Sequence, residues 1–312
     1  MNYRACSGCD AVDGALRTCV ENVLRTSPAR WSLALRNGKL LHASAVLGDE
    51  WLSLTAPLRL DIAHGVPWRL LESNALLPRA ARLTLQPRSG SASVRVDVRV
   101  RTNAPPTTSV TTACAALQEA VSVAEACTAR EHAPPVHCTR AERSVTAERL
   151  RELLAESGWS HQEQPGGGIS IDIGCHGAHL AASADHDAGA FRCGLRLGTV
   201  ADIPPLCREA VAVLLLTVTD ALPLVRAAAS AANAEDGVQL EAAFAAEPTA
   251  DDMRSTLDAL AAACAHTVRE APALLDPATA ATYLRVYRGA ACADTGAAAS
   301  RAPEFRTTVK GG

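Results

Sequence analysis

The sequence predicts an α+β fold of two tandem units, each an antiparallel sheet packed with helices in the order α-β-β-β-α-β-β-α. The main observation is an internal repeat: residues 70–101 recur about 146 positions later as residues 215–244. In both copies an apolar helical run ends at Asn74 or Asp220, and Ala-Leu, a proline, an arginine and two strands follow. In addition, 312 residues with 48% apolar content fit two domains of about 150 residues each.

The first unit is predicted from periodicity and turn signals. Apolar residues at helical spacing predict a helix over 11–25 that stops before Pro28. Asn37-Gly38 between two alternating runs is a strong hairpin signal, so these runs should pair as antiparallel strands. The expected elements are helix 11–25, strands 31–36, 39–45 and 50–55, helix 66–77, strands 80–86 and 93–101, and helix 109–127.

The strand over 93–101 alternates cleanly along its length. Its valines at 94, 96, 98 and 100 should face a core, and the charged residues between them should face water. This pattern predicts a sheet with one buried face and one exposed face.

A stretch with Pro134-Pro135 and mixed charge, residues 128–145, predicts the linker between the units. The domains are therefore expected at 1–127 and 146–275, with an extra helix at 276–288 and a disordered tail at 289–312. The second unit should contain helix 146–158, strands 169–173, 178–184 and 191–197, helix 205–221, strands 227–234 and 238–244, and a helix from 249 to about 271.

Two features of the second unit carry further expectations. The helix over 205–221 is apolar on nearly every side, so other elements should cover it on several sides. Thr249, with Asp252 three positions later, should cap the helix that follows.

Charge is unevenly divided along the chain. The net charge is −3, but residues 1–145 carry 17 Lys/Arg against 12 Asp/Glu (+5), and residues 146–312 carry 13 against 21 (−8). This split suits two halves that attract each other or that contact different partners, and ordinary solvated surface explains it too. Neither half is basic enough to predict nucleic acid as a ligand.

The chain is expected to be cytoplasmic and without a membrane partner. The N-terminus lacks a basic region followed by an apolar core, and the longest apolar stretch, 210–218, is about half a membrane span. Eleven cysteines at irregular spacing fit reduced thiols better than a disulfide framework.

No residue cluster predicts a metal site, a cofactor or catalysis. Cys6 and Cys9 with Cys19 form a single CxxC without a second pair, which is weak support for zinc. The group Cys175, His176, His179 and His186 spans a whole strand, about 20 Å at 3.3 Å per residue, and cannot share one ion. The glycines at 166–168 lack the context of a phosphate loop, and no catalytic motif is present. We therefore expect a protein that is not an enzyme.

The element order, together with the Asn/Asp-Ala-Leu step after each middle helix, resembles the type III secretion chaperone-like superfamily, which includes CesT-like and YbjN-like proteins. The best residue matches are 70–82 and 216–226, and the resemblance covers residues 11–127 and 146–271. Family chaperones are usually small acidic homodimers. This chain departs from them in its fused tandem form, its nearly neutral charge and its extra C-terminal helix.

The resemblance implies that the two units pair within one chain as a pseudo-dimer, which need not associate further. The expected seam, or partner-binding surface, comprises Trp68, Leu71, Leu214, Leu215 and Val218. It also implies a protein that binds an extended segment of a client, a secreted effector or a regulator. The alternative is a YbjN-like regulatory or scaffold protein that bridges two folded partners.

Overall fold

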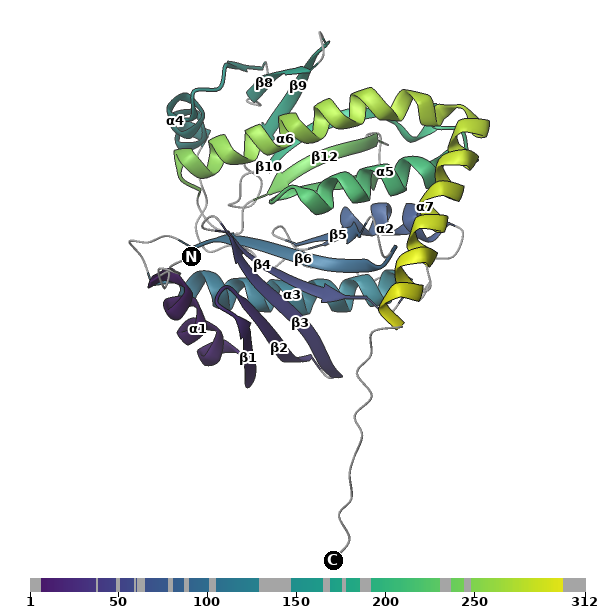
Figure 1. Cartoon of the computed structure of the whole chain (residues 1–312). Helices are drawn as coiled ribbons and strands as arrows, with labels where there is room; N and C mark the ends of the chain where they lie inside the picture. Colours follow the sequence, from purple (N-terminus) through teal and green to yellow (C-terminus); the bar gives the residue numbers. More distant parts are fainter. Residues whose placement is uncertain are drawn as a thin grey trace, which may run out of the picture.

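The computed structural model describes residues 7–37, 39–48, 51–58, 60, 65–77, 81–86, 90–100, 105–128, 147–164, 169–175, 178–185, 192–230, 237–243 and 248–299. The chain folds into two antiparallel sheets, and helices pack on both of them (Figure 1). We call the elements up to α3 the first half and those from α4 onward the second half. The predicted linker, residues 128–145, lies outside the described residues from position 129 onward.

The first half is built from three helices and six strands. In chain order they are α1 (Ser7–Cys19), β1 (Asn22–Ser27), β2 (Arg30–Asn37), β3 (Lys39–Gly48), β4 (Trp51–Pro57), α2 (Val66–Asn74), β5 (Ala81–Leu85), β6 (Ala92–Arg99) and α3 (Thr107–Thr128). The strands lie in the order β1-β2-β3-β4-β6-β5, and α3 packs on one face of this sheet.

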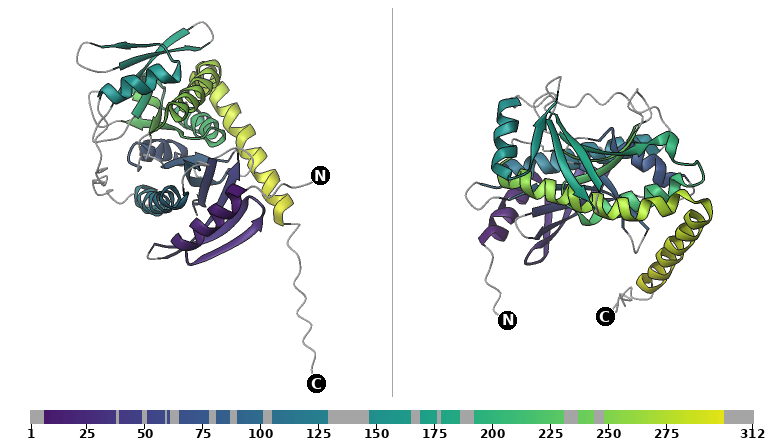
Figure 2. Two further views of the ribbon diagram at one scale, coloured as in Figure 1. Left: turned by 90° about the vertical axis from the view of Figure 1, so that its left-hand side faces the viewer. Right: turned by 90° about the horizontal axis from the view of Figure 1, so that it is seen from above.

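The second half has its own sheet, with strands in the order β7-β8-β9-β10-β12-β11. Its elements are α4 (Ala147–Ser157), β7 (His161–Glu163), β8 (Ile169–Cys175), β9 (Ala178–Asp185), β10 (Arg192–Thr199), the 3-10 turn η2 (Val200–Asp202), α5 (Arg208–Ala221), β11 (Val225–Ser230), β12 (Gly237–Ala243), α6 (Ala250–Glu270), the 3-10 turn η3 (Ala271–Leu275) and α7 (Pro277–Ala299). Helix α6 packs across this sheet, and α7 descends along the side of the molecule from the second half toward the first (Figure 2).

Several sequence predictions are confirmed. The two runs on either side of the hairpin signal pair as the antiparallel strands β2 and β3, with Arg36 opposite Leu40. Thr249 caps α6 through a capping box with Asp252. The apolar helix α5 is covered on several sides, because it contacts α2, α6, α7, β5 and β11.

The predicted element order is wrong in one respect, since each half has four strands before its middle helix. Helix α1 ends at Cys19, and residues 22–27 form β1, paired with β2. Pro28 therefore lies in a hairpin turn, and Leu24, expected on a buried helical face, is 66% exposed. The apolar residues Val20, Val23 and Leu24 fit a helical or a strand period, and pairing with β2 decides for the strand. The extra strand β7 is only three polar residues long and gave no periodic signal.

The prediction for the C-terminus is wrong over residues 289–299. Helix α7 does not end at Arg288 but continues to Ala299, and residues 300–312 lie outside the described chain. Its last turns are rich in alanine, the residue with the highest helix propensity, so the small-residue composition of this segment favours a helix.

The prediction of a water-exposed face on β6 is also wrong at its centre. Val94 and Val96 are fully buried as expected, but Asp97 on the opposite face is only 1% exposed. Arg82, on the neighbouring strand, is also 1% exposed. The second half covers this face, because α5 packs against β5.

Among the described helices we find none with the length and apolar character needed to cross a bilayer.

Candidate functional site

The two halves meet through their middle helices and the strands that follow them. Helix α2 packs against α5 and β11, and α5 packs against β5. We call this contact, formed by α2, β5, α5 and β11, the seam. In Figure 1 both middle helices lie in the centre of the molecule, between the two sheets.

A buried ion pair of the first half lies at the seam. Arg82 on β5 bonds to the carboxylate of Asp97 on β6, and their side chains are 2% and 0% exposed. Asp97 also accepts bonds from Arg95 Nε at 3.2 Å and from the Ser53 hydroxyl. Arg82 Nε then reaches across the seam and donates to the Thr219 carbonyl at 3.2 Å, near the end of α5. The pair thus connects the first sheet to the C-terminal turn of a helix in the other half.

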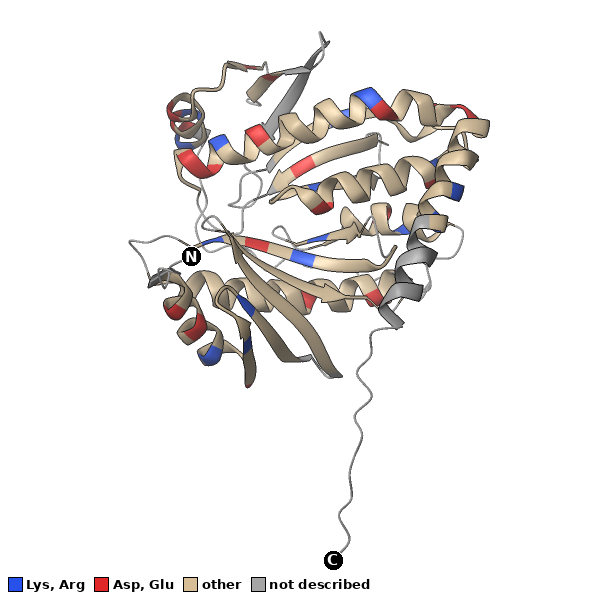
Figure 3. Cartoon of the chain, viewed as in Figure 1, with Lys and Arg blue, Asp and Glu red and all other residues tan. Residues whose placement is uncertain are grey.

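The second half has a corresponding pair on β11 and β12. Arg226 bonds to Glu241, fifteen residues later, as Arg82 does to Asp97. Arg226 Nη1 donates to the Leu77 carbonyl at 3.0 Å and to the Ala81 carbonyl at 3.3 Å, both in the first half. Each half therefore sends one buried arginine to backbone carbonyls of the other, and Figure 3 shows the charged residues inside β6 and β12. The Thr219 carbonyl lies in the last turn of α5, where helix carbonyls carry partial negative charge.

Asn74, at the end of α2, is fully buried and joins the two sheets directly. Its Oδ1 accepts from the Leu83 amide at 2.6 Å. Its Nδ2 donates to the Leu83 carbonyl at 3.1 Å and to the Ala227 carbonyl on β11 at 2.8 Å. One side chain thus fixes β5 and β11 relative to each other. Its counterpart in the repeat, Asp220, receives a bond on its carbonyl from Arg95.

The protonation of Asp97 follows from its surroundings. Burial by itself raises the pKa of this carboxyl, but the guanidinium charges of Arg82 and Arg95 outweigh burial and hold the pKa of Asp97 below its ordinary value. Asp97 is therefore ionised at neutral pH although it is fully buried.

The five residues predicted for the seam lie on α2 and α5, the two helices that contact each other there. All are buried, with Trp68 the most exposed at 9% and Leu71 and Leu215 at 0%. Trp68 donates from Nε1 to Glu72 at 2.7 Å, and the Arg208 guanidinium lies 5.5 Å from the centre of its ring. The latter contact joins α2 to the first turn of α5.

Sequence reasoning missed the polar residues of the seam: Asn74, Arg82, Asp97, Arg226 and Glu241. A signal for four of them was present, because each of the two similar segments has an arginine followed fifteen positions later by an acidic residue. The same spacing of opposite charges in both segments indicates ion pairs between neighbouring strands.

Beyond the seam, the same face of the first sheet becomes exposed. One row of cross-strand neighbours runs from Arg82 through Arg95, Thr55, Ser44 and Ser32 to Leu24. Burial falls steadily along it, from 1% exposure at Arg82 to 66% at Leu24. We call the part of this face on β1 to β4 the outer face. It also carries Leu40, which is 60% exposed.

Where the remaining candidate groups are described, they do not assemble into a site. Cys9 and Cys19 lie ten residues apart on α1, about 15 Å at 1.5 Å per residue, and Cys6 lies outside the described chain. Cys19 instead contacts the Thr111 hydroxyl at 2.9 Å. His176, His186 and residues 166–168 are also outside the described chain. Within the described residues, no three His, Cys, Asp or Glu side chains are grouped as a metal site.

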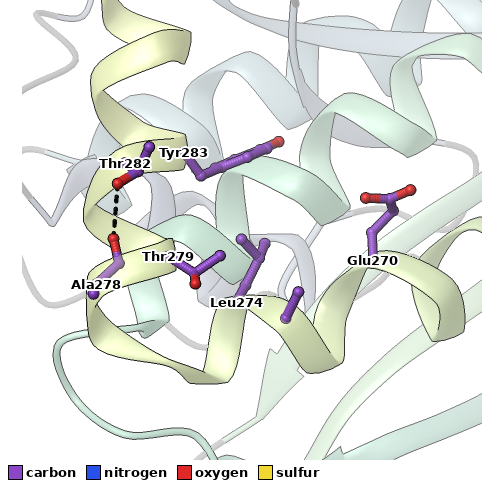
Figure 4. A pocket seen from close by; sticks show the side chains of 7 residues that line it. Glu270, Leu274, Ala278, Thr279, Thr282 and Tyr283 are labelled. Carbon is purple, nitrogen blue, oxygen red and sulfur yellow. Dashed lines mark hydrogen bonds between the residues drawn. The ribbon is translucent and has the colours of Figure 1, made fainter.

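A pocket of about 470 Å³ lies in the angle between the end of α6, η3 and α7 (Figure 4). Its two threonine hydroxyls are already engaged: that of Thr279 donates to Asp276 and that of Thr282 donates to the Ala278 carbonyl. Glu270 supplies the one carboxylate among the lining residues, so the pocket is mainly a gap in helix packing.

Comparison with known proteins adds no relative: no family model, no curated protein and no solved structure matches this chain.

Proposed function

We propose that this chain is a non-enzymatic protein-binding module, a fused pseudo-dimer of two type III secretion chaperone-like units that binds an extended segment of a client protein. The observation that carries the proposal is the reciprocal seam. Arg82 and Arg226 each pair within their own half and each donate to backbone carbonyls of the other half.

The seam supports a duplicated origin because its contacts run in both directions between corresponding elements. Both sheets share one strand order, with the last hairpin of each half at the seam. A twofold interface places the same patch of each copy in contact with the other, and a gene fusion of a dimer would retain this reciprocity.

The outer face is the surface that we propose for the client. At the seam the sheet face is polar and covered, whereas on β1 and β3 it exposes Leu24 and Leu40 among serines. Large exposed leucines on an open sheet face fit the side chains of an extended segment. Wrapping a disordered client distributes modest affinity over a large surface.

Isothermal titration against overlapping peptides from the proteins encoded beside this gene tests the proposal. We expect at least one extended peptide to bind, and Leu24→Asp with Leu40→Asp to weaken that binding about tenfold or more, which corresponds to about 1.4 kcal/mol. Leu206→Asp is the matched control, because Leu206 is 78% exposed in the second half. If the control variant loses binding equally, the outer face is not the client surface.

The titration also separates the two candidate roles. If no peptide binds while two folded neighbours bind simultaneously, the client proposal is wrong. That result would support the YbjN-like scaffold.

A further inference from the structure

Among the described residues of the first half no helix corresponds to α7, which lies against the outside of the second half. It starts after η3, where Asp276 accepts bonds from the amide and hydroxyl of Thr279, both at 2.8 Å. This cap belongs to α7 itself and defines where the helix begins. The residues before it, Ala271–Leu275, connect the end of α6 to α7.

One stripe of α7 holds it to the body. Ala280 is fully buried, and Tyr283, Leu284 and Tyr287 are partly buried against the core. These positions follow the i, i+3, i+4, i+7 spacing of a helix face. On the opposite side Val286 is 67% exposed. Helix α7 therefore attaches through a single narrow face.

The surface under this stripe belongs mainly to α5. The Tyr283 side chain lies beside Thr217 of α5. Arg288 bonds to the nearly buried Glu209 at 2.6 Å, and the Tyr287 hydroxyl lies 3.4 Å from the Gln86 carbonyl of the first half. We call this surface, comprising Glu209, Thr217 and the Gln86 carbonyl, the α5 seat.

Two observations indicate that α7 is separable from the body. On its other side, Ala278, Thr279 and Thr282 of the first two turns line the pocket between α7 and the end of α6, so that side is not packed against the body (Figure 4). Moreover, α5 also contacts α2, α6, η3, β5 and β11, so most of its packing does not depend on α7. Elements with few buried contacts are those that open locally at low cost.

We propose that the α5 seat is a docking site for an amphipathic helix of a partner protein, and that α7 occupies it in cis until the partner displaces it. The side chains of α7 show what the seat accepts. Counted from the small residue Ala280, they are an aromatic and a leucine at positions i+3 and i+4 and a second aromatic at i+7. A cation at i+8 then pairs with Glu209. This inference concerns a helical partner on the second half and is independent of the extended client.

A competition experiment on the full chain tests it. The probe is a fluorescent, hydrocarbon-stapled helical peptide with the sequence of residues 277–290, and its anisotropy reports binding. Because a cis occupant lowers the apparent affinity for a trans helix, we expect Ala280→Glu to bind the probe about tenfold or more tightly than the unmodified chain. Val286→Glu introduces the same charge on the exposed side of α7 and should behave like the unmodified chain. A probe with Arg288→Glu should bind Ala280→Glu at least about tenfold more weakly.

Amide hydrogen exchange is a second measurement, which shows whether Ala280→Glu releases α7 alone or unfolds the body as well. In Ala280→Glu, and in the milder Tyr287→Ala, amides of α7 should exchange faster while those of α5 remain protected. Loss of protection in α5 as well would show that α7 is an integral part of the core and would overturn the proposal. Equal probe binding by all variants would also overturn it. A concentration-dependent dimer of Ala280→Glu would assign the seat to a second copy of this chain instead.

Discussion

Removing the charge of Asp97 is the most direct test of the seam. In Asp97→Asn the side chain keeps its shape, but the guanidinium of Arg82 is left without a countercharge in a place where its side chain is 2% exposed. Breaking a buried pair on one side costs about 3–5 kcal/mol, because an uncompensated charge stays in a medium of low polarity. At about 2–4 °C per kcal/mol this corresponds to a fall in Tm of about 6–20 °C.

Urea unfolding followed by circular dichroism at pH 7 measures the change. The matched control is Asp251→Asn on α6, where the pair with Arg254 is exposed and the cost should stay below about 1 kcal/mol. The double variant Arg82→Met with Asp97→Asn should recover more than half of the lost free energy of unfolding, because it removes the unpaired charge. A loss below about 1 kcal/mol for Asp97→Asn alone would refute the argument.

The same pair predicts a dependence on pH. Since the pKa of Asp97 is held below its ordinary value, its ionised form stabilises the folded chain at pH values above about 4. This stabilisation is lost as the pH falls through the ordinary value toward the folded one. The difference in stability between the unmodified chain and Asp97→Asn should therefore shrink on acidification, and an unchanged difference down to pH 3 would contradict the assignment.

Three further outcomes are expected. Thr249→Ala removes the cap of α6 and should lower the free energy of unfolding by about 0.5–2 kcal/mol in urea denaturation. Leu24→Ala should cost less than about 0.5 kcal/mol and Leu33→Ala about 2–5 kcal/mol; a high cost at Leu24 would instead favour a helix there. Burial raises the pKa of the Cys193 thiol to about 12, so mass spectrometry after brief iodoacetamide treatment at pH 8 should find Cys193 unmodified and the half-buried Cys127 modified.

Local pattern predicted most elements because each depends on neighbouring residues. The pairing of β2 with β3 follows from a local turn signal between two alternating runs, and the cap at Thr249 depends on a bond three positions away. The burial of α5 could be predicted because a helix without a polar face cannot be left in water. The five seam residues are predicted from the internal repeat and from a family resemblance. The helices that carry them, α2 and α5, lie in contact.

The strands at the outer edges of the sheets, β1 and β7, could not be predicted from local sequence pattern. The apolar side chains of Val20, Val23 and Leu24 are compatible with either a helix or a strand, and only the neighbouring strand β2 selects the strand. At β7 the paired segment is too short to show any period.

The sequence was sufficient to predict which residues alternate along β6, where α2 and α6 begin, and that two similar segments occur about 146 positions apart. What covers the charged face of β6 depends on the tertiary structure. The alternation of residues along a strand shows which of its faces is polar. A polar face can lie in water or be buried with its charges paired, and the alternation does not distinguish the two. Arg82 and Asp97 form an ion pair, and Arg82 also donates to a carbonyl on α5, so that face can be buried at the seam. The outer face has no such pair at Leu24, which is exposed to solvent.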